Sequence, residues 1–262
     1  MQIRLSLTSD GQKDENWVMC ELTIIVPLYN GKKYIKENID TLLNIKCSKE
    51  IIIVDDESSD GSFEYCKELY ADNSNVRVMQ KENGGVASSR NYGLKNAKGN
   101  YVMFVDQDDI VVENVVDAAI NIFDEYNCDA LFWSTEFKYN DRIQKCDEVY
   151  KNVLVDRDEI VSEILPAMLY IRPCEYASYF GHIWGGIFCR KIIQEHEINF
   201  KHFIHYEDDY LFVLDLLLNA NRIYMFKETG YFWRQNDTSY SHILKSIPNF
   251  FERFSFQKRF PQ

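Results

Sequence analysis

The sequence has no long apolar run, no Cys-x-x-Cys pair and no excess of positive charge. Its most apolar stretch, 210–218, is interrupted by Asp215 and is too short for a transmembrane helix. The net charge is −12 at pH 7. Because proteins that bind nucleic acids need a basic surface for the phosphates, we expect no nucleic acid partner.

Cysteines are present, but they are seven in number and scattered. This pattern predicts reduced thiols in a cytoplasmic protein rather than a disulfide framework or a zinc site. The first residues, Met1-Gln-Ile-Arg-Leu-Ser, lack the apolar core of a signal peptide. We therefore expect a cytoplasmic protein, at most peripheral at the inner face of the cell membrane. The aromatic stretch 250–260 is the candidate for such a contact, with packing against its own domain as an equal alternative.

Linkers rich in Gly, Pro or Ser are also missing, which predicts one continuous domain. Hydrophobic residues make up 46% of the chain and aromatic residues 15%, enough for a packed core. Residues 1–20 are polar and turn-rich, so we expect them to form an extension outside the fold. The rest divides into a regular half, 21–110, and a less regular half, 111–262.

Strand and helix signals alternate in the first half. Apolar runs predict strands, and apolar residues at helical spacing predict the helices between them. The expected strands are 22–27, 51–54, 76–79 and 101–105, and the expected helices are 33–43, 58–69, 84–98 and 112–123. Such alternation predicts parallel pairing through right-handed crossovers. The predicted fold class is α/β, with a Rossmann-like, mostly parallel central sheet flanked by helices.

The second half is less regular. Its expected strands are 129–135, 142–150, 222–226 and 230–233, and its expected helices are 156–170, 207–219 and 243–256. Asp156 is a plausible N-cap of the first of these helices.

Carboxylates follow the strand expected at 101–105, in the run Asp106-Gln-Asp-Asp109. A parallel sheet presents such residues at its carboxyl edge, where ligands of α/β proteins bind. Asp106 and Asp108 are suited to a divalent cation and a nucleotide. An acidic turn that caps the next helix explains this motif equally well on its own.

Five motifs follow one another along the chain. They are Val26-Pro-Leu-Tyr-Asn30, Val54-Asp-Asp-Glu-Ser-Ser-Asp-Gly61, Asn83-Gly-Gly-Val-Ala-Ser-Ser-Arg-Asn91, Asp106-Gln-Asp108 and His205-Tyr-Glu-Asp-Asp209. In this order and at strand ends, they make residues 21–235 similar to family 2 glycosyltransferases of the GT-A fold, whose bacterial members build surface polysaccharides. The resemblance implies a nucleotide-sugar-binding half at 21–110 and an acceptor-binding half with a C-terminal helical segment at 111–262.

For the nucleoside, the resemblance implies contacts from Pro27 and Tyr29. The Tyr29 ring could stack on a base or fill the edge of the core. Asp55 and Asp56 end the second strand, where a carboxylate can accept a hydrogen bond from the uracil imide or a ribose hydroxyl. The alternative role is to cap the next turn. We expect one aspartate in each role, and the sequence leaves open which.

For the diphosphate, the resemblance implies contacts from Gly85 and Arg90. Gly85 opens a predicted helix, whose N-terminus favours phosphate; a solvated helix arginine is the alternative for Arg90. Asp106 and Asp108 match the metal motif of the family, with Asp106 and Gln107 also assigned to the nucleotide sugar. All-oxygen ligands favour Mn²⁺ or Mg²⁺ over zinc.

For the acceptor, Glu207-Asp208 resembles the Glu-Asp pair of inverting members, in which the aspartate is the general base. An acidic first turn that favours the helix dipole is compatible with that role. Trp184 is assigned to the acceptor pocket, where it could stack on a sugar; a core tryptophan is the alternative. Gly186 stands where the family usually has lysine.

The expected activity is transfer of a hexosyl or N-acetylhexosaminyl group from a nucleoside-diphosphate sugar, a UDP-sugar above all, to a glycan or lipid-linked glycan. One alternative is a catalytically inactive sugar-nucleotide-binding protein, which only Gly186 supports. A weaker alternative is an Asp-x-Asp phosphohydrolase, although such enzymes carry the motif near the start of the chain, usually before Gly-Thr.

Overall fold

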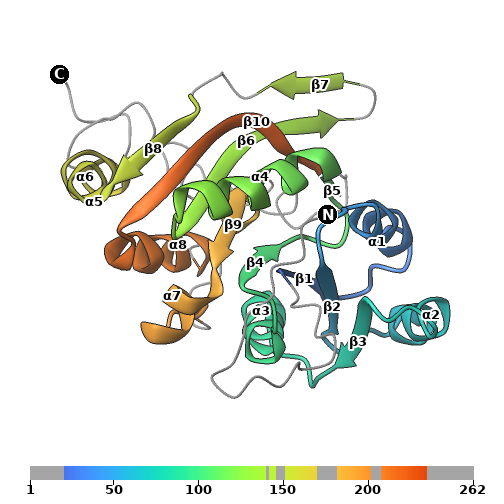
Figure 1. Cartoon of the computed structure of the whole chain (residues 1–262). Coiled ribbons are helices and arrows are strands. Elements are labelled where there is room, and N and C mark those ends of the chain that lie inside the picture. The colour runs from blue at the N-terminus through green and yellow to red at the C-terminus, as the bar shows by residue number, and fades with distance from the viewer. Residues whose placement is uncertain (1–20, 140–141, 146–150, 170–181, 202–207, 235–262) are drawn as a thin grey trace, which may run out of the picture.

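The computed structural model describes residues 21–139, 142–145, 151–169, 182–201 and 208–234 (Figure 1). These residues form one ten-stranded sheet in the order β3-β2-β1-β4-β9-β6-β10-β5, with β7 paired to β6 and β8 paired to β10. The strands are β1 (Leu22–Leu28), β2 (Lys49–Asp55), β3 (Val76–Gln80), β4 (Tyr101–Phe104), β5 (Ile110–Val111), β6 (Ala130–Tyr139), β7 (Arg142–Lys145), β8 (Val153–Asp156), β9 (Gly186–Cys189) and β10 (Arg222–Arg234).

The helices within these ranges flank the sheet. They are α1 (Ile35–Leu43), α2 (Ser62–Leu69), α3 (Gly85–Asn96), α4 (Glu113–Tyr126), α5 (Arg157–Glu159), α6 (Leu165–Met168), α7 (Arg190–Glu195) and α8 (Asp208–Asn219), with a π-helical turn η1 (Ile160–Ile164) and a 3₁₀ turn η3 (Ile183–Gly185). None of the helices in the described ranges is long and apolar enough to cross a membrane.

The first half is the parallel part of the sheet, as predicted. β1 pairs in parallel with β2 and β4, and β2 with β3, through the connecting helices α1, α2 and α3. Successive residues Ile24 and Ile25 are both fully buried, because helices cover both faces. α3 packs closely on β1: a Cβ at Gly93 would lie 2.4 Å from Ile25 Cγ2. This arrangement brings the carboxyl ends of β1, β2 and β4 to one edge.

The second half of the sheet is mixed, and here the sequence-based prediction was incomplete. β9, which was not predicted, lies antiparallel between β4 and β6, and β10 pairs in parallel with β6. The two strands predicted at 222–226 and 230–233 are one strand, β10, whose register shifts between Phe226 and Tyr231. β7 covers 142–145 of the strand predicted at 142–150. Residues 146–150 and the helix predicted at 243–256 lie outside the described residues.

The segment after β8 begins as predicted, because the Asp156 carboxylate accepts the Glu159 N–H at 3.0 Å. It continues through α5, η1 and α6, so its regular part is interrupted by a π-helical turn.

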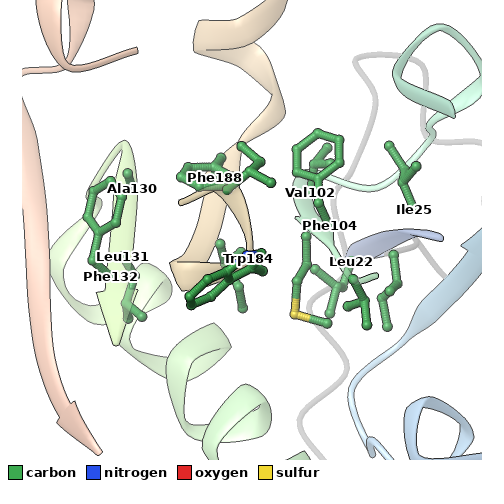
Figure 2. Packing of buried hydrophobic residues seen from close by; sticks show 14 of the residues in the cluster. Leu22, Ile25, Val102, Phe104, Ala130, Leu131, Phe132, Trp184 and Phe188 are labelled. Atoms are coloured by element: carbon green, nitrogen blue, oxygen red, sulfur yellow. The ribbon is translucent and has the colours of Figure 1, made fainter. Parts of the chain in front are cut away.

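Aromatic side chains join the two halves of the core. Phe104 of β4 makes edge contacts with Phe200 (5.1 Å between ring centroids) and with Phe212 of α8 (5.6 Å). Figure 2 shows Phe188 of β9 between Phe104 and Phe132 of β6, with centroid distances of 6.4 and 5.8 Å. This packing fixes α8 beside the end of β4.

Candidate active site

The acidic motif lies in a tight turn directly after β4. The Asp109 N–H donates to the Asp106 carbonyl (3.2 Å), and Asn38 of α1 donates to the carbonyls of Asp106 (3.0 Å) and Asp109 (2.8 Å). The Asp106 side chain is 35% exposed and Asp108 is partly exposed, whereas Asp109 is buried. The turn therefore presents Asp106 and Asp108 at the edge of the sheet and directs Asp109 inward.

Arg90 connects this turn to the start of α8. Its buried guanidinium donates from Nη2 to Asp106 Oδ1 (3.0 Å) and from Nη1 to Asp209, and Nη1 lies 3.7 Å from Asp208 Oδ2. The guanidinium also lies 5.3 Å from the centre of the Phe200 ring. Arg90 was predicted to face a diphosphate. In the structure its Nη atoms contact carboxylates, so it holds two of the motifs together.

The charges in this cluster shift the pKa of its members. Burial lowers the pKa of Arg90, but the coulombic attraction of Asp209, Asp106 and Asp208 outweighs it and the pKa is raised. Burial raises the pKa of the Asp209 carboxyl to about 6, against the opposing effect of Arg90, and the negative charges of Asp208 and Asp106 add to the rise. Asp209 was not predicted as a site residue, although it directly follows the Glu-Asp pair.

A second network supports the acidic turn from inside the fold. Tyr231 of β10 donates to Asp109 Oδ2 (2.7 Å) and accepts the Asp106 N–H (3.1 Å), while the Arg234 N–H donates to Asp109 Oδ1 (2.8 Å). Burial, followed by the charges of Asp106 and Asp108, raises the pKa of Asp109. Tyr231 carries no motif signal, because its role depends on how β10 pairs with β5 and β6.

Asp55 and Asp56 take different roles at the end of β2. Asp56 accepts the N–H groups of Gly84 (3.0 Å) and Gly85 (2.7 Å) and forms an ion pair with Lys81 (2.6 Å). It therefore occupies the N-terminus of α3, where phosphate contact by Gly85 was predicted; that contact remains a prediction. Gly85 has a φ of +82°, which favours glycine.

The Asp55 side chain is fully buried but only partly hydrogen-bonded. Its Oδ2 accepts the Ser58 N–H and the Gln80 side-chain amide, both at 3.0 Å. Its Oδ1 has no hydrogen-bond partner among the residues that the structure describes. A buried carboxylate oxygen without a donor is costly, so Asp55 is the aspartate with capacity for a ligand.

The end of β1 lies beside Asp55. Pro27 pairs with Val54 within the sheet, and the Tyr29 side chain just beyond is 52% exposed. The exposed ring is available for stacking on a base. The Gln107 amide was predicted to bind the nucleotide sugar, but here it is hydrogen-bonded to the Tyr29 backbone.

Trp184 belongs largely to the core. It lies in η3, is 9% exposed and stacks on Tyr231 with ring centroids 5.2 Å apart and on His182 at 4.5 Å. Gly186 begins β9 at a close approach to β6: a Cβ there would lie 2.0 Å from the Leu131 carbonyl oxygen. No side chain fits at that position, which gives a packing reason for the missing lysine. Glu207 lies outside the described residues.

A divalent cation at the acidic turn would have few ligands from the protein. Within the described ranges, no three His, Cys, Asp or Glu side chains are grouped to hold a metal ion. Mg²⁺ is commonly held by one or two carboxylates together with substrate phosphates, and it keeps several waters. The oxygen donors of Asp106 and Asp108 fit Mn²⁺ or Mg²⁺ by this chemistry.

The comparisons with known proteins bear on the fold and on the region that carries this arrangement of acids. Residues 23–149 match the model for glycosyl transferase family 2. The chain thus contains a family 2 glycosyltransferase region, and the architecture is the GT-A fold.

Particular relatives extend the similarity beyond this region. The chain is 28% identical over 224 residues to the uncharacterized glycosyltransferase EpsJ of Bacillus subtilis (strain 168), covering 85% of this chain and 63% of EpsJ. It is 27% identical over 222 residues to the poly(ribitol-phosphate) beta-N-acetylglucosaminyltransferase TarS of Staphylococcus aureus (strain Mu50 / ATCC 700699), covering 82% of this chain and 35% of TarS.

A solved structure of Staphylococcus aureus TarS 1–349 with UDP-GlcNAc superposes with a TM-score of 0.71 at 25% identity. The match covers 90% of this chain and 65% of the TarS chain. The chain thus spans less than two thirds of the length of these relatives.

Proposed function

We propose that the protein is an inverting glycosyltransferase that moves a sugar from a UDP-sugar to a glycan or lipid-linked glycan, with Asp208 as general base and Mn²⁺ or Mg²⁺ at Asp106 and Asp108. The observation that carries this proposal is the contact of one guanidinium, Arg90, with both Asp106 and Asp208. A donor diphosphate near Asp106 and an acceptor hydroxyl near Asp208 would then meet at the transferred sugar.

The reaction is a single displacement. The acceptor oxygen attacks the anomeric carbon, Asp208 accepts the hydroxyl proton, and the bond from that carbon to the UDP oxygen breaks. Attack opposite to the leaving group inverts the configuration without a covalent enzyme intermediate. A bound cation supplies charge neutralisation for the departing diphosphate. Arg90 holds the side chains of Asp106 and Asp208 close together, because its guanidinium is buried and contacts both carboxylates.

UDP is the proposed donor nucleotide. The buried Asp55 Oδ1 is suited to accept the imide N–H of uracil, and the exposed Tyr29 ring to stack on the base. The TarS structures that resemble this chain contain UDP and UDP-GlcNAc, which supports a UDP-hexose or UDP-N-acetylhexosamine donor. We also propose that the protein acts in the cytoplasm, peripheral to the membrane where it meets a lipid-linked acceptor, and that Trp184 and Glu207 contribute to acceptor binding.

An inactive sugar-nucleotide-binding protein is the second candidate. Its one support was Gly186, and the close approach to Leu131 explains that glycine by packing. The phosphohydrolase alternative loses support, because the family match spans the Asp-x-Asp motif.

The test combines donor binding with hydrolysis of UDP-sugars in the absence of acceptor. UDP with Mn²⁺ should raise the unfolding temperature more than UDP alone. Asp108→Asn should abolish this additional stabilisation. Asp208→Asn should keep it but lower hydrolysis of the UDP-sugar, in which water takes the place of the acceptor hydroxyl, by about 10²–10⁴-fold, the usual effect of losing a general base. Asp215→Asn, the same substitution later in α8, is the matched control and should leave both unchanged.

Two results would contradict the proposal. Hydrolysis of the UDP-sugar by Asp208→Asn at the wild-type rate would show that Asp208 is not the general base. Failure of every UDP-, GDP- and dTDP-sugar to release nucleotide, despite UDP binding, would favour the inactive binding protein.

A further inference from the structure

The side chain of Gln107, the middle residue of the Asp-x-Asp turn, bonds twice to the backbone of Tyr29. The Tyr29 N–H donates to Gln107 Oε1 at 2.8 Å, and Gln107 Nε2 donates to the Tyr29 carbonyl at 3.1 Å. Because a carboxamide has a donor and an acceptor side by side, it can satisfy both backbone groups at once. Glutamate would lack the donor.

These two bonds continue the sheet beyond its last regular pair. β1 pairs with β4 only as far as Ile25 and Phe104, followed by the bond from the Val105 N–H to the Ile25 carbonyl. Past this point no strand of the described ranges pairs with the backbone of Tyr29 on the β4 side. The Gln107 amide takes the place of that strand, as the satisfaction of backbone polar groups requires.

The sequence leaves space for this amide at Gly31. A Cβ at Gly31 would lie 2.4 Å from Gln107 Oε1 and 2.5 Å from Gln107 Cδ. Gly31 does not have a positive φ. Glycine at this position is therefore explained by the nearby Gln107 side chain and not by the backbone conformation. Two segments far apart in the chain are thus built around the same contact.

We propose that Gln107 is a positioning residue that couples the Tyr29 loop to the Asp106–Asp108 turn, so that a cation bound by the turn strengthens nucleoside binding at Tyr29. This inference rests on the proposed function, since it takes Tyr29 as the base-stacking residue and the turn as the cation site. It assigns Gln107 a role through Tyr29 rather than a contact with the nucleotide sugar.

The coupling can be separated from direct contact between cation and diphosphate by using uridine, which has no phosphate. Calorimetric titration would measure the Kd of uridine with and without saturating Mg²⁺. In the wild-type protein Mg²⁺ should strengthen uridine binding about fivefold, the lower end of usual coupling between sites. In Gln107→Met, which keeps the chain length but removes both bonds, the two Kd values should become equal.

A second variant reaches the same contact from the other side. Gly31→Ala keeps Gln107 but displaces its flexible amide from Tyr29, and it should also lose the Mg²⁺ effect. The double variant Gly31→Ala/Gln107→Met should show no further change, because both substitutions remove one interaction. Gln194→Met, at an exposed position of α7, is the matched control and should keep the fivefold effect.

The outcomes separate this inference from the proposed function. Metal-dependent UDP binding in wild type, together with an unchanged Mg²⁺ effect on uridine in either variant, would overturn the role of Gln107 alone. The same follows if Mg²⁺ leaves wild-type uridine binding unchanged while it strengthens UDP binding. Absence of any UDP binding with Mg²⁺ would overturn the proposed function and this inference together.

Discussion

Arg90 on α3 is hydrogen-bonded to Asp209 on α8, 119 positions later in the chain. The same guanidinium contacts Asp106 and Asp208, so one cation is shared by three carboxylates. The Arg90 side chain is held in place, because it is 4% exposed and both its Nη atoms are hydrogen-bonded. The arrangement of the site therefore depends on this pair.

Replacement of Arg90 by lysine tests that dependence. Lysine keeps the charge but cannot reach Asp106 and Asp209 with a planar fork. We expect the free energy of unfolding to fall by about 2–3 kcal/mol, the effect of losing a hydrogen bond between charged groups, and transfer activity to fall with it. Urea denaturation would measure the first effect. Arg222→Lys, at an exposed site, is the control and should change stability by less than about 0.5 kcal/mol. A stable, active Arg90→Lys variant would show that the cluster does not need bidentate contacts.

Asp209 should make the stability of the protein depend on pH. Its carboxyl has a pKa of about 6 in the folded protein, raised from 3.8 chiefly by burial. Between pH 3.8 and about pH 6 the folded state binds a proton that the unfolded state has released. The contribution of this proton to the free energy of unfolding is fully present below pH 3.8 and is lost as the pH rises through about 6.

Asp209→Asn removes this titration. Between pH 4 and pH 6, wild type should lose stability relative to the variant, by an amount on the order of 3 kcal/mol for a shift of this size. Denaturant titrations of both proteins across this pH range measure the difference in the free energy of unfolding. If this free energy depends on pH in the same way in both proteins, Asp209 does not have the raised pKa. Asp215→Asn, partly exposed on the same helix, serves as the control.

Tyr231→Phe tests the network that supports the acidic turn. The substitution leaves the buried Asp109 carboxylate without one donor and the Asp106 N–H without its acceptor. We expect a loss of about 1–3 kcal/mol in stability, because unsatisfied buried groups keep their desolvation cost. Weaker stabilisation by UDP with Mn²⁺ should accompany it.

Tyr224→Phe is the matched control for this prediction, since Tyr224 lies on the same strand, β10. It should alter stability by less than about 0.5 kcal/mol. Equal thermal unfolding and equal metal-dependent UDP binding in the two variants would show that the hydroxyl of Tyr231 does not support the turn.

The parallel half of the fold could be predicted because its signals are local. The buried strands β1 and β2 contain continuous apolar runs, 24–28 and 51–54, and they end in the turn after Leu28 or in Asp55. The helices between them carry apolar residues at helical spacing. Parallel pairing then follows from the alternation, so the meeting of Tyr29, Asp55 and Asp106 at one edge was predicted from the sequence.

The mixed half could not be predicted in the same way. β9 has only four residues, and it forms a strand because it pairs with β4 on one side and with β6 on the other. Gly186 therefore counted as support for an inactive protein, whereas in the structure a Cβ at this position would collide with the Leu131 carbonyl. Tyr231 lies in no motif, and Asp209 was not singled out although it ends the fifth motif. Both were missed because hydrogen bonds across the fold give these residues their roles.

The sequence by itself determined the α/β architecture of the first half, the order of the motifs and the acids that stand at the strand ends, because strand burial and helix periodicity are properties of neighbouring residues. Only the tertiary structure decided that Asp56 occupies the N-terminus of α3 while one oxygen of Asp55 finds no donor in the described part of the chain. It also decided that Arg90 joins two acidic motifs and that Gln107 bonds to Tyr29. Such choices among polar partners depend on which groups the packed core brings within hydrogen-bonding distance and deprives of water.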